Sequence, residues 1–222
     1  MPRTLDLADH ATRDDLRIYL ERLLRAGRDE ARLIVRDSLL AVFGCTQAPE
    51  DLMDTAPVVL VLRSFALSRP VDQPLDLVVP ARALLDRLAR MGIVGLRLDL
   101  PDAEVTAAWA GVLPPAGEWR AEGVIDAASL RGVAEEGMRR ITETLPDSPG
   151  DPVVRRVRRA VWGTEIAPGL PAAVAFAAES MGFLGSDEPV RLTGTRTWRR
   201  LATPRGEVLV RTGPRTRPGA VG

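Results

Sequence analysis

The chain has 222 residues, of which 45% are hydrophobic and 27% are charged, and its formal net charge is zero. These values are typical of a folded globular chain that buries one large or two small cores. All 30 basic residues are arginine and His10 is the single histidine, which excludes lysine-dependent catalysis and a zinc site built from several histidines. The composition favours a protein that is not an enzyme and has no cofactor.

The sequence also indicates where the protein works. Its first residues carry four aspartates and no apolar core of a signal peptide. No run of about 18 apolar residues exists that would span a membrane. Cys45 is the only cysteine, so an internal disulfide is excluded. A cytoplasmic protein without a membrane segment is expected.

The N-terminal part predicts one helix followed by strands. Leu16, Tyr19, Leu20 and Leu23 form a helical stripe. Thr12 and Asp15 resemble a capping box at its start, and Gly27 is expected to end it with a positive φ. Residues 28–45 split at Asp37–Ser38 into two strands, although a continuous helix remains open. Further along the chain we expect strands at 57–67, 76–80 and 95–100, and a helix at 80–92.

A Pro- and Gly-rich joint at 112–118 predicts a boundary between domains 1–112 and 113–222. After it come a strand at 119–126 and a helix at 127–144. Asp126 is the expected N-cap of that helix, and its expected inner face is Leu130, Val133, Met138 and Ile141. Residues 213–222 are expected to be a disordered tail. The predicted fold class is α+β, mainly antiparallel strands in the N-terminal part, then helices and a C-terminal β-hairpin.

Two further helices are expected in the C-terminal part. Residues 151–163, with Asp151 as the cap, form an amphipathic helix whose apolar stripe begins at Val153 and whose outer face is wholly basic. Residues 170–185 are apolar nearly all round, which predicts a helix in the middle of the core.

The segment 197–211 is predicted to be a β-hairpin with a three-residue loop and a bulge at Gly206. In that register Arg199 lies opposite Arg211 on the exposed face. Trp198 packs in the core and Arg200 extends along the surface.

Charge is divided unevenly along the chain. Residues 1–151 sum to −7 and residues 152–222 to +7. Three interpretations remain open: the two parts attract each other, the basic part binds an acidic protein or a second copy, or it binds nucleic acid. The candidate binding residues are Arg155, Arg156, Arg158, Arg159, Arg199, Arg205 and Arg211.

The predicted function is a non-enzymatic binding or regulatory protein that uses this basic C-terminal surface on protein partners or in self-association. One alternative is a nucleic-acid-binding protein that uses the same arginines. The other is a carboxylate-dependent hydrolase whose acidic residues are distant in the sequence. No cofactor, metal or membrane contact is predicted.

The order of "DDLRIYLERLL", "PVVLVLRSFALS", "LPAAVAFAAESMGFLG" and "TWRRLATPRGEVLVR" resembles a family of uncharacterised actinobacterial proteins. The resemblance spans most of the chain and implies no catalytic residues, because that family has no assigned activity. It implies a cytoplasmic bacterial protein.

Overall fold

A computed structural model of the chain describes residues 3–50, 54–186 and 188–211. It consists of two compact units. Unit 1 comprises Met1–Thr46 and Leu60–Leu113, and unit 2 comprises Gln47–Val59 and Pro114–Gly222. Each unit has its own strands and its own helices. The tail predicted at 213–222 lies outside the described residues.

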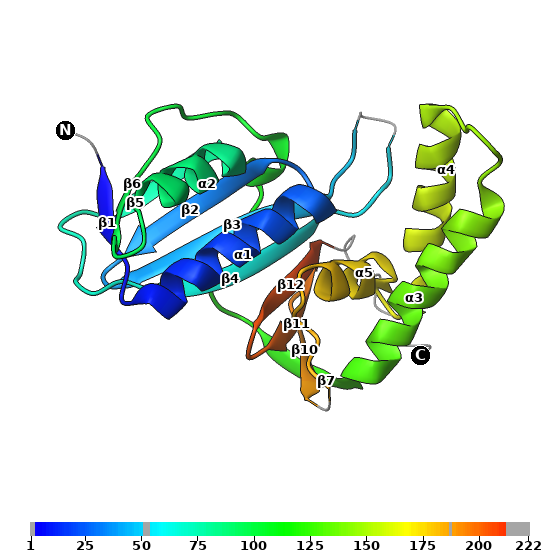
Figure 1. Ribbon diagram of the computed structural model, residues 1–222. Coiled ribbons are helices and arrows are strands. Elements are labelled where there is room, and N and C mark those ends of the chain that lie inside the picture. Colours follow the sequence, from blue (N-terminus) through cyan, green and yellow to red (C-terminus); the bar gives the residue numbers. More distant parts are fainter. Residues whose placement is uncertain (1–2, 51–53, 187, 212–222) are drawn as a thin grey trace. The chain divides into compact units, whose positions relative to one another are not determined.

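Unit 1 contains most of the N-terminal elements. They are β1 (Thr4–Asp6), α1 (His10–Ala26), β2 (Glu30–Arg36), β3 (Leu39–Gln47), β4 (Val59–Ala66), β5 (Leu75–Pro80), α2 (Ala81–Arg90), β6 (Arg97–Asp99) and the 3-10 helix η1 (Ala108–Gly111). The strand order is β5-β2-β3-β4, and β1 pairs with β6. Figure 1 shows α1 and α2 side by side on the same face of this sheet, and the two helices contact each other.

Local physics accounts for the elements of unit 1, with two corrections. Residues 28–45 form two strands, and Asp37 turns the chain with a φ of 49°. Asp9, rather than Thr12, caps α1 by accepting a 2.7 Å hydrogen bond from the Thr12 amide. Gly27 has a φ of −144°, so the expected positive φ is wrong. A glycine is required there because a Cβ would lie 2.3 Å from the Cys45 carbonyl oxygen.

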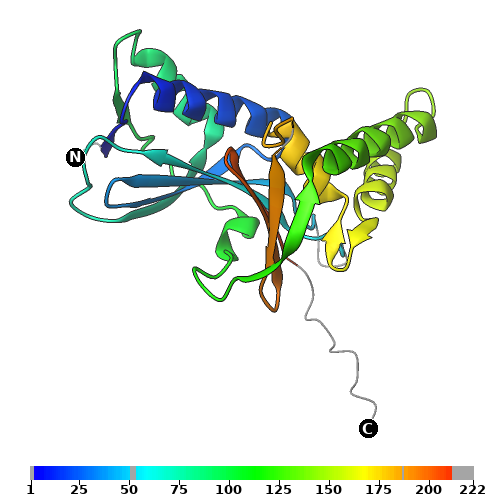
Figure 2. The ribbon, with the colours of Figure 1, turned by 90° about the horizontal axis from the view of Figure 1, so that it is seen from below.

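Unit 2 contains the remaining elements. They are β7 (Arg120–Asp126), α3 (Ala127–Thr144), α4 (Asp151–Trp162), β8 (Glu165–Ala167), β9 (Leu170–Pro171), α5 (Ala173–Ser180), β10 (Pro189–Gly194), β11 (Trp198–Thr203) and β12 (Gly206–Arg211). The main sheet has the antiparallel order β12-β11-β10-β7, and β8 pairs with β9. Helix α5 contacts β12 and α3, and α3 contacts α4 (Figure 2).

The sequence predicts the N-cap of α3 correctly but not its inner face. Asp126 caps α3 as expected, by accepting from the Ser129 amide. The inner face of α3, however, runs through Leu130, Ala134 and Gly137, and Met138 is exposed. Gly137 is on this face because the Trp162 ring packs directly on its Cα, and an added Cβ would lie 2.2 Å from that ring.

The other two helices differ from expectation in their ends and burial. Gly150 rather than Asp151 is the N-cap of α4. Only Val161 and Trp162 of α4 are buried, and Val153 is 43% exposed, because α4 packs mainly on α3. Helix α5 is shorter than predicted, but five of its eight residues are buried, as its apolar composition indicated.

The predicted hairpin exists, but its register was wrong by one residue. Thr203 pairs with Gly206 around a two-residue loop, so Arg199 lies opposite Val210 and Trp198 opposite Arg211. A slip of one residue exchanges the faces of one strand relative to the other. Gly206 adopts a φ of 155° and lies against the Phe183 ring, which leaves no space for a side chain. Trp198 is buried, as predicted.

The predicted α+β class with mainly antiparallel strands is confirmed. Among the described residues, no helix combines the length and the apolar character needed to cross a bilayer.

Candidate functional site

The charge asymmetry seen along the sequence disappears within the units. Unit 1 contains 14 arginines and 14 acidic residues, and unit 2 contains 16 of each. The basic segment 152–222 is neutralised because the acidic residues of 114–151 and of the loop 47–59 belong to the same unit. Of the three interpretations of the charge division, the ion pairs that join residues of 152–222 to Glu50, Asp54 and Glu122 support attraction between the two parts of the sequence.

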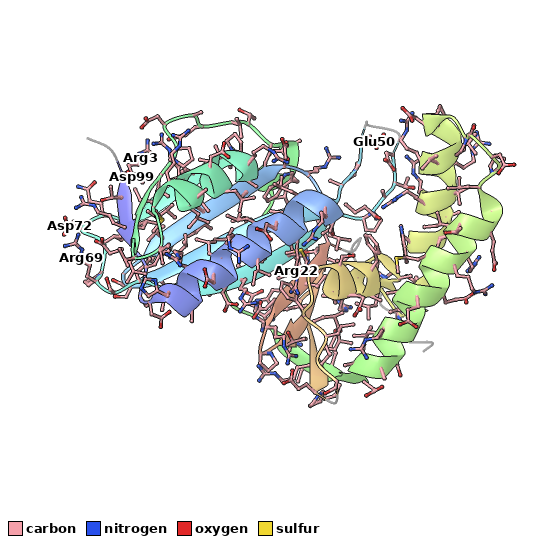
Figure 3. The ribbon with its side chains drawn as sticks, in the orientation of Figure 1. Arg3, Arg22, Glu50, Arg69, Asp72 and Asp99 are labelled. Atoms are coloured by element: carbon pink, nitrogen blue, oxygen red, sulfur yellow. The ribbon has the colours of Figure 1, made fainter. Side chains whose placement is uncertain are left out.

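Two of the predicted site residues on α4 are engaged with the loop between β3 and β4. Arg155 lies 3.4 Å from the Glu50 carboxylate, and Arg159 lies 2.9 Å from that of Asp54. Figure 3 labels Glu50 in this loop. The neighbouring α4 residue Arg158 stacks 5.9 Å from the centroid of the Phe176 ring. Helix α4 therefore uses part of its basic face to hold a loop of its own chain.

Asp54 is the centre of this contact. Its side chain is only 3% exposed, and burial alone would raise the pKa of its carboxyl group. The amides of Ala56 and Glu50 and the guanidinium of Arg159 outweigh burial and hold that pKa below its usual value. The carboxylate is therefore charged at neutral pH and stabilises the loop.

The remaining predicted site residues are scattered. Arg199 is 1% exposed, and it pairs with Glu122 at 2.7 Å. It also donates to the Thr195 and Trp198 carbonyls. Arg156 and Arg211 are exposed, and Arg205 pairs with Glu188 at 2.7 Å. The structure does not bring the seven arginines together, and the predicted ridge of Arg199 and Arg211 is absent because of the hairpin register.

A second arginine-rich surface lies on the helices of unit 1 and was missed in the sequence. The two helices carry seven arginines and four acidic residues, a net charge of +3. The arginines are Arg13, Arg17, Arg22, Arg25, Arg82, Arg87 and Arg90. We call this surface the helical layer. Because unit 1 as a whole is neutral, its remaining residues sum to −3.

Three of the four acidic side chains of the helical layer are already engaged in ion pairs. Asp15 pairs with Arg63, which lies on β4 outside the layer. Glu21 pairs with Arg17 within α1 at 2.8 Å. Among the described residues, Arg82, Arg87 and Arg90 of α2 have no carboxylate within ion-pair distance. The helical layer therefore presents unneutralised positive charge.

The end of unit 1 where β1 and β6 lie is different in character. Figure 3 shows Arg3, Arg69, Asp72 and Asp99 together there. Arg69 pairs with Asp6, and Arg3 pairs with Glu104 at 2.7 Å. Opposite charges compensate each other at this end, so it has no preference for a polyanion.

Unit 2 contains a cavity of about 510 Å³. Its apolar wall consists of Pro49, Ala56, Pro57, Val58, Pro171 and Val210. Polar side chains at the cavity include Thr55, Glu165, Thr197 and Arg211. The volume is within the range of small-ligand sites.

In the described part of the chain, no three His, Cys, Asp or Glu side chains gather as a metal site. Cys45 is fully buried in unit 1, and a buried thiol is inert.

The chain resembles solved structures of bacterial DNA sliding clamps. Against the DNA polymerase III subunit beta of Pseudomonas aeruginosa the TM-score is 0.54 at 14% identity. Against the sliding clamp of Bacillus subtilis it is 0.54 at 12% identity, and against the griselimycin-bound clamp of Bartonella birtlesii it is again 0.54 at 12% identity. In each case the match covers 98% of this chain and 66% of the clamp chain. No curated protein matches the sequence.

This likeness overturns the predicted function. The prediction was a binding or regulatory protein that acts through a basic C-terminal surface, with a nucleic-acid-binding protein using the same arginines or a hydrolase as alternatives. The fold is instead that of DNA clamps, and the arginines on which the prediction depended are largely paired within unit 2.

The sequence itself matches two family models. Residues 114–215 match the family described as Domain of unknown function (DUF8185). Residues 1–111, half of the chain, match a second model, and the chain belongs to that family, Domain of unknown function (DUF8010).

Proposed function

We propose that this protein is a clamp-type, non-catalytic protein that associates with duplex DNA through the helical layer of unit 1. The observation that carries the proposal is the likeness to DNA polymerase sliding clamps over 97–98% of the chain. The chain spans only 66% of the length of a clamp chain. We therefore propose DNA association from the fold and the charge of the helical layer, and do not assign it from the clamps' function.

The charge of the helical layer supports DNA as the partner. The two helices carry a net charge of +3, whereas unit 1 as a whole is neutral. The positive potential of unit 1 is therefore concentrated on its helices. Arginine side chains on helices bind phosphate oxygens without reading the base sequence. Binding of this kind weakens steeply as salt rises, because counterions are released from the DNA.

The experiment measures binding of the full chain to a labelled 30-base-pair duplex by fluorescence anisotropy over a series of NaCl concentrations. The test variant is the double reversal Arg82→Glu and Arg90→Glu, since both side chains are exposed and lack a carboxylate partner. We expect the affinity to fall by about tenfold or more, and the slope of log K against log salt to become shallower by about two.

A matched control carries the same change in net charge elsewhere in unit 1. Arg36→Glu and Arg97→Glu reverse two exposed arginines that lie outside the helical layer. The control should retain most of the affinity. Equal losses in both double variants would show a response to net charge alone, and absence of binding by the native chain at about 50 mM salt would overturn the proposal. DNA association would also fit the cytoplasmic location predicted from the sequence.

A further inference from the structure

The most exposed large aliphatic side chains of the described residues lie in the turn after α2. Ile93 is 89% exposed and Val94 is 83% exposed. Gly92 and Gly95 flank them and add no side chains, so the two aliphatic residues form a narrow apolar projection, which we call the tip. Two adjacent aliphatic residues held in water in this way carry an unfavourable hydration free energy that a binding partner would remove.

The tip adjoins the helical layer and is held rigidly by Arg13 of α1. The Nη1 of Arg13 donates to the carbonyl oxygens of Gly92, Ile93 and Gly95 at 3.0, 2.7 and 3.3 Å. The Arg13 side chain is only 16% exposed, so its role is to brace the turn. Gly92 has a φ of 67°, a conformation that favours glycine. Because these contacts order the backbone, the tip loses little conformational entropy when it binds.

The charge beside the tip favours a polyanionic partner. Helix α2 leads directly into the tip and carries three arginines and one acidic residue, Asp86. Arg90 is exposed, lies three residues before Ile93 and has no carboxylate within ion-pair distance among the described residues. On α1, the Asp14 carboxylate lies 3.5 Å from Arg13 and is compensated by it. An apolar projection on a positive surface matches a partner that offers phosphates on its outside and apolar groups within.

Duplex DNA meets these requirements better than a lipid bilayer does. The minor groove is about 6 Å wide, and the glycines on both sides of the tip make it narrow enough to enter. Aliphatic side chains that enter this groove can separate neighbouring base pairs and kink the duplex. A helix that inserts into a membrane presents a broad apolar face. Helix α2 has none to offer, because Leu84 and Leu88 are 1% and 5% exposed in unit 1.

We propose that the tip is a wedge: Ile93 and Val94 enter the minor groove of DNA that lies on the helical layer and partly separate two base pairs. The inference rests on the proposed function, since the helical layer must first bring the duplex to the tip. It adds two properties to that function, a kink in the bound DNA and a preference for DNA that is easily unstacked. Unpairing costs least at a mismatched base pair, so mismatched duplexes should be preferred.

The test compares binding of the full chain to an intact duplex and to the same duplex with a central mismatch, by fluorescence anisotropy at about 50 mM NaCl. We expect the native chain to bind the mismatched duplex about tenfold more tightly. Energy transfer between dyes at the two DNA ends should show a kink of about 20–90° in the complex.

The test variant is the double substitution Ile93→Ser and Val94→Ser, at two side chains that are more than four-fifths exposed and so do not support the core. It should lose both the preference and the kink. The slope of log K against log salt should stay unchanged, because the variant removes no charge. The matched control, Val124→Ser, changes an aliphatic side chain that is 63% exposed on β7, and it should keep the preference and the kink.

The outcomes separate this inference from the proposed function. A native chain that binds neither duplex would overturn both. Salt-dependent binding of the intact duplex, with equal affinity for the mismatched one and no kink, would overturn the wedge alone. A preference and a kink that survive in the double variant would also overturn it. Sedimentation with vesicles of phosphatidylcholine and phosphatidylserine tests the other partner: vesicle binding that the double variant abolishes, without a kink in DNA, would assign the tip to lipid and overturn the wedge.

Discussion

The buried ion pair between Arg199 and Glu122 offers the sharpest test of how unit 2 is stabilised. Arg199 on β11 is 1% exposed, whereas the Glu122 side chain on the edge strand β7 is 23% exposed. The Glu122 side chain crosses β10 above Gly194, where an added Cβ would lie 2.4 Å from its carboxylate. The two partners therefore differ in their access to water.

This difference predicts that the two single substitutions are not equivalent. Glu122→Ala leaves the Arg199 guanidinium buried without the Glu122 carboxylate. Removing one partner of a fully buried ion pair costs about 3–5 kcal/mol. Because water reaches the Glu122 side of the pair, we expect about 2–3 kcal/mol. Arg199→Met removes the buried charge, and Glu122 turns toward solvent at the open edge of the sheet. Its cost should be nearer 1 kcal/mol, mainly for the Thr195 carbonyl that loses a donor.

Urea unfolding followed by tryptophan fluorescence measures both free energies, since Trp119, Trp162 and Trp198 all belong to unit 2. With a slope of about 1–3 kcal/mol per molar urea, Glu122→Ala should lower the midpoint by about 1 M or more. The double variant should resemble Arg199→Met alone. If Arg199→Met is the more destabilising single change, the reasoning from burial is refuted.

Three more outcomes follow from individual contacts. Gly137→Ala should destabilise unit 2 by about 1–3 kcal/mol, because its Cβ would meet the Trp162 ring, and unchanged urea unfolding would contradict this. Gly27→Ala should destabilise unit 1 by a similar amount or more, since the obstacle is the backbone carbonyl of Cys45, and thermal unfolding of the variant measures the loss. Asp54 has a lowered pKa in the folded state, so its stabilisation is present above its ordinary pKa of 3.8 and is lost as the pH falls through the folded value. Asp54→Asn should therefore be less stable than the native chain at pH 7 and should differ from it less as the pH falls below about 4, which acid titration of the urea midpoint tests.

Much of the secondary structure was predictable from the sequence, because each element depends on residues close to one another along the chain. The stripe that begins at Leu16 and the Asp126 cap correctly indicated α1 and α3. The turn at Asp37 separated β2 from β3. Periodicity and capping act within one or two turns, and the chain supplies those contacts whatever the fold.

The register and burial of the hairpin were not predictable in the same way. Both a two-residue and a three-residue loop fit the local residues of the segment from Trp198 to Arg211. The choice depends on the Phe183 ring beneath Gly206 and on the Glu122 carboxylate that receives Arg199. Glu122 is 77 positions away along the chain, so no local pattern reveals it.

The candidate site shows the same limit. Counting charges along the chain indicated α4 as the binding surface. In the structure, however, Arg155 and Arg159 of α4 form ion pairs with Glu50 and Asp54, about a hundred residues earlier in the chain. Counting charges by helix would have revealed the helical layer, since the arginines of α1 and α2 are plain in the sequence. That the two helices share one face still required the fold.

The sequence by itself determined the positions of most helices and strands, the α+β class and the exclusion of lysine chemistry, since these follow from composition and from neighbours within a few residues. The tertiary structure alone decided which charges are neutralised and which remain exposed. These ion pairs join residues that are far apart in the sequence and come together only in the folded chain, and their free energy depends on how deeply they are buried. For this reason the basic C-terminal segment is largely paired within unit 2. Among the described residues, Arg82, Arg87 and Arg90 remain without an ion pair on the helical layer of unit 1.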